Sequence, residues 1–213
     1  RQAAGEFKSD KAWWHYAAAL EMSAVCLHMT DGPWREMDEA AEKATSTYLK
    51  LSTGAGDRPA RHATRAVLLQ MDLLAHVPPK KREQAYRDVA QALVDQSTQE
   101  SSICAALLLE QSALCFRSAR VPMQRKYAFY LILAGYRYIS CSQRRHAVRT
   151  YASALRVYSG RGWAHIEDHV HFTLGRNCSQ LGRIELALAY FLRLLRHSRQ
   201  PAERQATFLK ELS

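Results

Sequence analysis

One pattern of small and aromatic residues occurs twice in the second half of the chain, about forty residues apart. Each copy holds a glycine, an alanine twelve residues later and an aromatic residue four positions after that: Gly135, Ala147 and Tyr151, then Gly175, Ala187 and Phe191. Two helices approach closely only where side chains are small. The pattern therefore predicts two similar pairs of antiparallel helices, and we expect Tyr138, Tyr151 and Phe191 to fill the space toward the next pair.

This spacing is typical of tetratricopeptide-like repeats, which are helix–turn–helix units of about 34 residues. The clearest repeats cover residues 123–159 and 163–198. Apolar periodicity and the breakers between apolar segments predict helices throughout the chain and no strand. We therefore expect an all-α fold, an α-solenoid of antiparallel helix pairs that forms a single helical-repeat domain over residues 1–213.

The helix boundaries follow from the glycines, prolines and polar clusters. Ten helices are predicted: 9–29, 33–52, 59–76, 80–96, 103–120, 123–139, 142–158, 163–181, 183–197 and one from Pro201 onward. Residues 53–57 (Thr-Gly-Ala-Gly-Asp) should form a flexible turn. Ser97 and Glu100 fit a capping box in front of the fifth helix.

The composition limits the compartment and the partners. The formal net charge of +10 favours an acidic partner, which would be nucleic acid, an anionic membrane or an acidic protein face. The cysteines are odd in number and lack CxxC spacing: Cys26, Cys104, Cys115, Cys141 and Cys178. We interpret them as small buried hydrophobic residues in a reducing compartment. No transmembrane segment or signal peptide is recognisable, and we interpret the chain as a segment of a longer protein.

The chain carries no motif of an enzyme. A nucleophile elbow and a phosphate-binding loop are both missing, so we predict no catalytic residues and no cofactor. Histidines and acids gather in one segment, His165, Glu167, Asp168, His169 and His171. His165 and His169 have a spacing that a metal ion could use. Because HExxH and a third ligand are missing, we favour helix-start electrostatics and hydrogen bonding to the neighbouring turn, and predict no metal site.

A row of arginines provides the candidate partner-binding residues: Arg145, Arg149 and Arg156 on one helix, and Arg193 and Arg196 on a later one. Such a row could dock an acidic protein face or lipid headgroups, each charge contributing about 1 kcal/mol near an anionic membrane. An ordinary solvated helix face explains the same residues. Basic and aromatic residues also alternate at 125–130, which could stack on RNA, but helical spacing indicates that Tyr127 and Leu131 pack in the core.

Several blocks of the second half resemble subunit eight of the trafficking protein particle (TRAPP) complex. They are residues 122–129, 133–135, 162–163, 167–169, 172–176 and 200–212. The resemblance covers about Leu109 to Ser213, and the first half offers no comparable motif. It implies a subunit specific to TRAPP III, a cytosolic tethering complex that catalyses nucleotide exchange on a Rab-family GTPase in endoplasmic reticulum–Golgi traffic and autophagosome formation.

The same resemblance implies that the exchange chemistry lies on other, smaller subunits, and that this subunit directs the complex to Golgi, ER-derived and pre-autophagosomal membranes. Its implied partners are other TRAPP subunits, a Rab GTPase through the complex and an anionic membrane. From the residues alone, two other functions are possible. One is a basic helical-repeat protein that binds RNA, although we expect no nucleic acid, and the other is a chaperone adaptor that grips the terminal carboxylate of a peptide.

Overall fold

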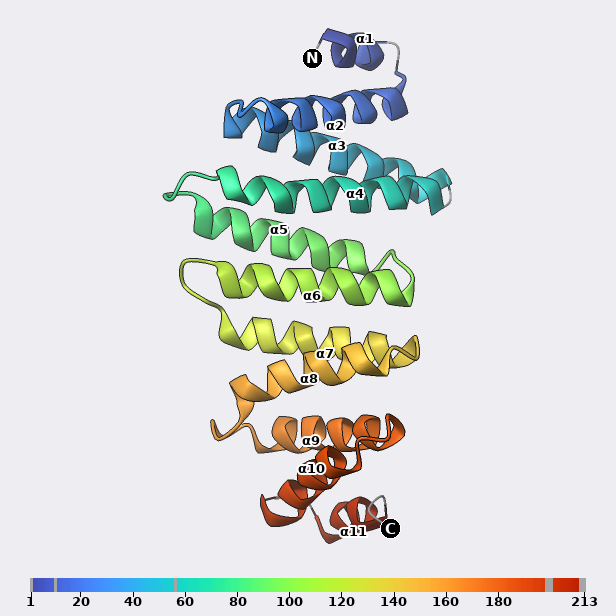
Figure 1. Ribbon diagram of the computed structural model, residues 1–213. Helices are drawn as coiled ribbons and strands as arrows, with labels where there is room; N and C mark the ends of the chain where they lie inside the picture. Colours follow the sequence, from blue (N-terminus) through green and yellow to red (C-terminus); the bar gives the residue numbers. More distant parts are fainter. Residues whose placement is uncertain (1, 10, 56, 198–200, 211–213) are drawn as a thin grey trace. The chain divides into compact units, whose positions relative to one another are not determined.

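The computed structural model describes residues 2–9, 11–55, 57–197 and 201–210. Within these residues the chain is all-α and contains no strand, as predicted (Figure 1). Within each of its two compact units, most helices run antiparallel to the next helix in sequence and pack against it, the arrangement expected of an α-solenoid. The chain divides into two compact units, one formed by Arg1–Ser101 with Ser118–Pro122 and the other by Ser102–Arg117 with Met123–Ser213. The single repeat domain over residues 1–213 stays a prediction.

The described residues of the first unit form five α-helices and a short 3-10 turn. They are α1 (Gln2–Ser9), α2 (Trp13–Met29), α3 (Trp34–Ala55), α4 (Asp57–Leu73), η1 (Leu74–His76) and α5 (Arg82–Ser97). Alanines make up most of its two buried clusters: Ala17, Ala44, Ala63 and Ala66 around Tyr48, and Ala24, Ala40 and Ala41 around Met37 and Leu73. Because alanine keeps the helices close together, α3 packs tightly between α2 and α4.

Three predictions for the first unit are wrong. The expected helix over 9–29 is interrupted, because Lys11 adopts a left-handed conformation with φ of 56° and separates α1 from α2. Residues 53–55 continue α3 instead of forming a turn, and α4 starts at Asp57; Gly56 lies outside the described residues. Ser97 is the last residue of α5 and its hydroxyl donates to Val94 O at 2.6 Å, while Glu100 accepts from Thr64, so the two form no capping box.

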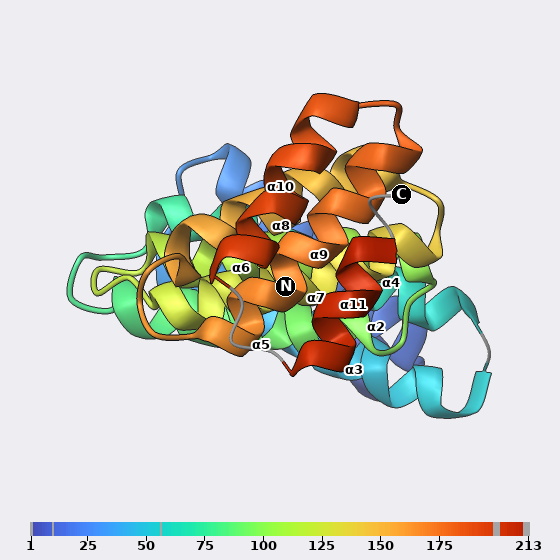
Figure 2. The ribbon, with the colours of Figure 1, turned by 90° about the horizontal axis from the view of Figure 1, so that it is seen from below.

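The second unit contains the predicted repeats. Its helices are α6 (Ser102–Ser118), α7 (Gln124–Ser140), α8 (Arg144–Tyr158), α9 (Ala164–Gln180), α10 (Ile184–His197) and α11 (Ala202–Lys210). Helices α7 to α10 begin and end within two residues of the predicted bounds. Helices α7 and α8 form one pair and α9 and α10 the other, and α9 and α10 lie side by side (Figure 2).

The repeated glycines lie where their helices cross most closely. A Cβ atom placed on Gly135 would come within 2.6 Å of the ring of Tyr151, and one on Gly175 within 2.7 Å of the ring of Phe191. The two rings therefore cover the glycine of their own pair, and Val148 of the first pair packs against the buried cluster that contains Phe191. Tyr138 contacts the helix before its pair, because its hydroxyl donates to Glu110 on α6 at 2.9 Å.

The turns within the two repeats have the same geometry. In the first, the amide of Gln143 donates to Tyr138 O at 2.8 Å and Ser142 is left-handed, with φ of 61°. In the second, Arg183 donates to Cys178 O at 2.9 Å and Gly182 has φ of 72°. This pattern is the Schellman motif, which satisfies the free carbonyl groups at a helix end. The repeat therefore extends through the turns, although only one of them contains glycine.

All five cysteines are free thiols, but their burial differs from the prediction. Cys115 and Cys178 are buried, Cys104 and Cys141 are half-buried, and Cys26 is exposed. Cys26 is exposed because α2 buries the face that carries Ala17 and Ala24, and a residue two positions beyond Ala24 lies on the other side of the helix.

Candidate interaction surface

Helix α8 separates its buried residues from its arginines. Its buried face consists of Ala147, Thr150, Tyr151, Ala154 and Tyr158. Arg145, Arg149 and Arg156 are exposed on the other side, where the sequence predicted them. Helix α10 follows the same rule, with Ala187, Phe191 and Leu194 buried and Arg193 and Arg196 exposed. We refer to these five arginines as the basic surface.

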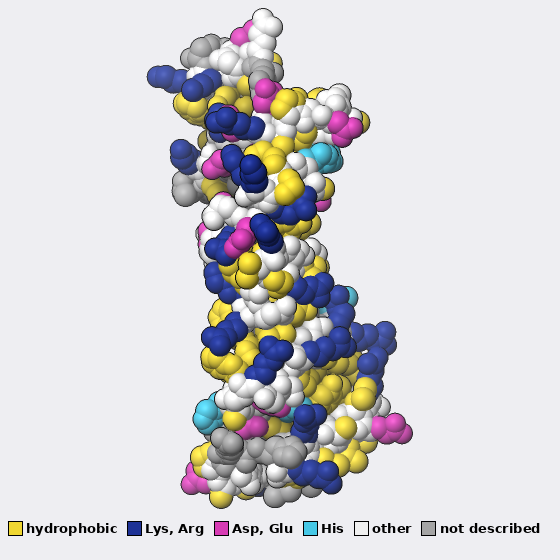
Figure 3. Space-filling view, turned by 90° about the vertical axis from the view of Figure 1, so that its left-hand side faces the viewer, with side chains coloured by type: hydrophobic (Ala, Val, Ile, Leu, Met, Phe, Trp, Pro, Cys, Tyr) yellow, Lys and Arg dark blue, Asp and Glu magenta, His cyan; other side chains and the backbone are white. Residues whose placement is uncertain are grey.

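One hydrogen bond and one electrostatic effect connect the arginines of α8 and α10 with the neighbouring helix. Arg193 Nη2 of α10 donates to the hydroxyl of Ser159, the residue that follows α8, at 3.3 Å. Burial raises the pKa of Tyr190 on α10, and Arg156 of α8 acts against that rise through its charge. The space-filling view shows Lys and Arg side chains among hydrophobic ones at the level of α8 to α10 (Figure 3). The structure therefore brings Arg156 and Arg193 into one region.

Arg149 has an additional structural contact. Its Nη2 donates to Oε2 of Glu110 at 2.8 Å, and this same oxygen accepts from the hydroxyl of Tyr138. The Glu110 side chain is only 13% exposed, so the arginine and the tyrosine stabilise a carboxylate that has lost most of its water.

The first unit contains a similar group. Glu21 is buried and accepts from the Tyr48 hydroxyl at 3.0 Å and from Arg65 Nη2 at 2.6 Å. A buried glutamate held by a tyrosine and an arginine thus occurs once in each unit. Arg149 thus stabilises a buried glutamate in the second unit, as Arg65 does in the first. Of the five arginines of the basic surface, we therefore expect Arg149 to contribute most to the fold.

Exposed aliphatic residues accompany the arginines on α10, and the sequence interpretation missed them. They are Ile184, Leu186, Leu188 and Leu192, with exposed fractions of 44% to 63%. Ile184, Leu188 and Leu192 recur every four residues and form a stripe along one side of the helix. A sequence signal was present, because α10 carries more aliphatic residues than one buried face can hold. An exposed stripe of this kind next to positive charge is typical of an interaction surface.

The acids and histidines at the start of α9 serve the fold. Glu167 accepts from the Ser159 hydroxyl at 3.1 Å and from the Gly160 amide at 3.3 Å, which confirms the predicted bonding to the neighbouring turn. His171 is buried, and its Nε2 lies 3.8 Å from Oε1 of Glu167, beyond hydrogen-bond distance. Burial and the charge of Arg193 lower the pKa of His171, although Glu167 and Asp168 act in the other direction. In the described residues, no three or more His, Cys, Asp or Glu side chains are arranged so that they could hold a metal ion.

None of the helices in the described part of the chain has the length and apolar character that a bilayer crossing requires.

Comparison with known proteins extends the resemblance to the amino-terminal half. A family model described as "ER-Golgi trafficking TRAPP I complex 85 kDa subunit" matches residues 1–78. The human protein "trafficking protein particle complex subunit 8" is 37% identical over 212 residues. This match covers 97% of the chain and 14% of the human protein. The resemblance inferred from residues 109–213 is confirmed, and it includes the half in which no motif pointed to it. The chain is therefore similar to this TRAPP subunit along almost its entire length.

Proposed function

We propose that this chain is a non-catalytic interaction arm of a TRAPP III tethering complex. It supports the membrane targeting of a complex that exchanges nucleotide on a Rab-family GTPase, in ER–Golgi transport and autophagy. Its partners are other TRAPP subunits, and an anionic membrane is a second, peripheral contact. It acts at the cytoplasmic side of Golgi, ER-derived and pre-autophagosomal membranes.

The observation that carries this proposal is the identity of 37% over 97% of the chain to a TRAPP subunit. The structure supports an interaction role in particular. Helix α10 presents an aliphatic stripe beside Arg193 and Arg196, and a surface that is apolar and basic at once fits a protein partner with an acidic rim.

The test is a co-purification experiment with charge reversal. A variant with Arg145, Arg156 and Arg196 changed to Glu leaves the Arg149–Glu110 ion pair intact, so the fold should be preserved. We expect it to recover less of the TRAPP core subunits, or to float less with anionic vesicles. The matched control changes the exposed residues Lys8, Arg61 and Arg120 to Glu, which alters the net charge equally at other places.

Three outcomes would contradict the proposal. The charge-reversal variant and the control could recover the core subunits equally and float equally with vesicles. The basic surface would then be an ordinary solvated helix face without a binding role. Nucleotide exchange by the isolated chain would contradict the non-catalytic assignment. Tight binding of mixed RNA, with an affinity that falls steeply with salt, would favour the RNA-binding alternative.

A further inference from the structure

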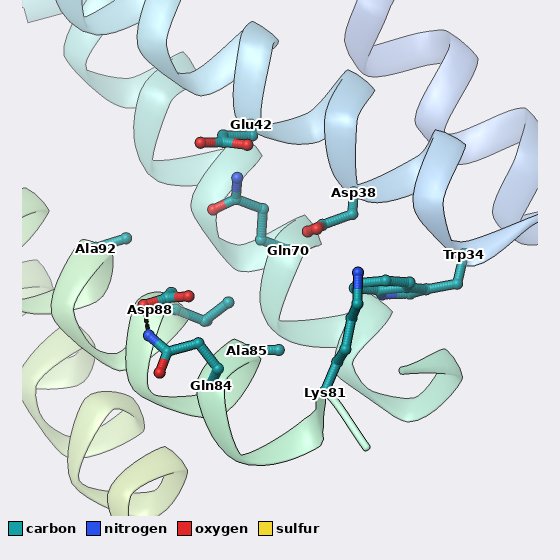
Figure 4. A pocket seen from close by; sticks show the side chains of 10 residues that line it. Trp34, Asp38, Glu42, Gln70, Lys81, Gln84, Ala85, Asp88 and Ala92 are labelled. Atoms are coloured by element: carbon teal, nitrogen blue, oxygen red, sulfur yellow. Dashed lines mark hydrogen bonds between the residues drawn. The ribbon is translucent and has the colours of Figure 1, made fainter. Parts of the chain in front are cut away.

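The first unit contains a groove of opposite charge to the rest of the chain. It is a cavity of about 490 Å³, which lies within the range of roughly 300–1,000 Å³ that ligand sites occupy. Helix α3 contributes Trp34, Asp38 and Glu42, α4 contributes Gln70, and α5 with the residue before it contributes the opposite wall (Figure 4). That wall consists of Lys81, Gln84, Ala85, Asp88, Val89 and Ala92.

The groove is lined by three carboxylates, Asp38, Glu42 and Asp88, and by one cation, Lys81. Asp38, Glu42 and Asp88 form no ion pair with any described residue. The ammonium group of Lys81 lies 5.5 Å from the centre of the Trp34 ring and forms a cation–π interaction with it. Asp88 accepts a hydrogen bond from Gln84 Nε2 at 2.6 Å, which orients the carboxylate without neutralising it. The groove therefore holds excess negative charge in a chain of net charge +10.

The carboxylates that line the groove repel one another. Burial raises the pKa of Asp38, and the charges of Glu42, Asp88 and Glu39 raise it further, while Lys81 acts in the other direction. A positive group placed between α3 and α5 would relieve this repulsion.

Gln70 provides an independent sign of a ligand. Its side chain comes from α4, at the floor of the groove, and Figure 4 shows its amide nitrogen turned toward Glu42. Gln70 is only 9% exposed, yet it forms no hydrogen bond with any described residue. The Nε1 atom of Trp34 is also buried without a partner. The unpartnered Gln70 amide and the buried Nε1 of Trp34 therefore leave hydrogen-bonding capacity at the groove that a polar ligand can use.

We propose that this groove binds a lysine- or arginine-bearing segment of a partner polypeptide. The cationic head of the partner lies between Asp38 and Asp88, and the Gln70 amide bonds to the same head or to the backbone of the segment. Alkyl stems of long basic side chains pack on Trp34, Val89 and Ala92. The carboxylates repel a terminal carboxylate, so the groove does not suit the acidic peptide of an adaptor. This inference does not rest on the proposed TRAPP function.

The experiment measures binding of two helical peptides to the full chain by calorimetry. One peptide is rich in lysine and alanine, and the other has every lysine replaced by glutamate. We compare the parent with the variant Asp38→Asn/Asp88→Asn, which keeps the size of both side chains. The matched control, Asp72→Asn/Asp95→Asn, removes two exposed carboxylates of the same unit that do not line the groove.

We expect the lysine peptide to bind the parent and the control equally, and the groove variant about tenfold or more weakly, as for loss of close charge pairs. The glutamate peptide should not bind. Gln70→Leu should weaken binding of the lysine peptide without changing the charge. The groove variant should melt at or above the temperature of the parent, because it loses repulsion, so loss of binding cannot be mistaken for unfolding.

Equal weakening by the groove variant and the control would overturn the proposal, because net charge would then explain the binding. No binding of the lysine peptide at low salt would overturn it as well. Spermine serves as a third probe. If it binds as tightly as a peptide of equal charge, the groove recognises any polycation and the assignment to a polypeptide is wrong.

Discussion

A single hydrogen atom at Gly135 determines how closely α7 and α8 can pack. A Cβ atom there would lie 2.6 Å from Cε2 of Tyr151 and 2.9 Å from the Thr150 hydroxyl oxygen. Tyr151 is 2% exposed and Thr150 1%, so neither side chain can move into solvent. Any larger residue must therefore separate the helices or displace the ring.

We predict that Gly135→Leu lowers the free energy of unfolding by about 3 kcal/mol, the upper end of the usual cost of overpacking. Urea denaturation followed by circular dichroism measures it. The control is Gly5→Leu, because a Cβ at Gly5 has no neighbour within 4 Å, and its effect should be small.

A double variant locates the cause. When Gly135→Leu is combined with Tyr151→Ala, the two losses should be non-additive by about 1 kcal/mol or more, because the added side chain can occupy the space of the ring. Fully additive losses would mean that the glycine and the ring do not share this contact.

At the scale of the elements, the turns of the two repeats differ in one residue. Ser142 adopts the same left-handed conformation as Gly182. A non-glycine residue in this conformation costs about 1–2 kcal/mol, and glycine loses roughly 0.5–1 kcal/mol more entropy on folding. Ser142→Gly should therefore stabilise the chain by about 0.5–1 kcal/mol, and Gly182→Ser should destabilise it by a similar amount. Thermal melts of both variants measure this, and a shift of the same sign in both would contradict it.

The Arg149–Glu110–Tyr138 group should contribute to stability more than the other exposed arginines do. Arg149→Ala leaves a carboxylate that is 13% exposed with one partner fewer. We expect a loss of about 1 kcal/mol, between that of a surface ion pair and that of a hydrogen bond to a buried charge. Arg145→Ala is the matched control and should change the unfolding free energy by less than about 0.5 kcal/mol. Equal effects in chemical denaturation would show that the Glu110 contact does not stabilise the fold.

The helices of the second unit could be predicted from sequence because breakers separate them. Glycine and polar residues fall between α7, α8, α9 and α10, and the repeat fixes their register. The break at Lys11 could not be predicted, because neither glycine nor proline marks it. The helical conformation of residues 53–55 was missed for the opposite reason. Glycine there suggested a turn, but α3 continues through Gly54 to Ala55 despite the low helix propensity of glycine.

The candidate sites were predictable only in part. The exposure of Arg145, Arg149 and Arg156 follows from helical periodicity on α8 alone. The acidic groove could not be predicted in this way. Asp38 and Asp88 lie fifty residues apart in sequence, and only the packing of α3, α4 and α5 brings them together. The contact of Glu110 with Arg149 is long-range for the same reason.

On the scale of the whole molecule, the two units should respond differently to acid. The lowered pKa of His171 means that the folded second unit takes up its proton less readily than the unfolded chain. Stability of that unit is therefore complete above the ordinary pKa of 6.5 and falls as the pH decreases below it. In the first unit, the pKa of Asp38 lies above its ordinary value of 3.8, so the repulsion that it feels weakens as the pH decreases toward that value.

We predict that hydrogen exchange measured at pH 7.5 and pH 5.5, corrected for the intrinsic rate, shows a loss of protection in α9 and α10 and none in α3. His171→Leu removes the titrating group and should abolish the difference in α9 and α10. If that variant loses protection as much as the parent does, another group causes the acid sensitivity.

The contact between each repeated glycine and its ring has a consequence for the evolution of related chains. Gly135 and Tyr151 are sixteen residues apart, as are Gly175 and Phe191, and each pair shares a space that only one large side chain can fill. Selection should act on the pair as one unit. In a set of aligned relatives, a larger residue at the first position should therefore occur together with a smaller one at the second, and such covariation should be independent in the two repeats.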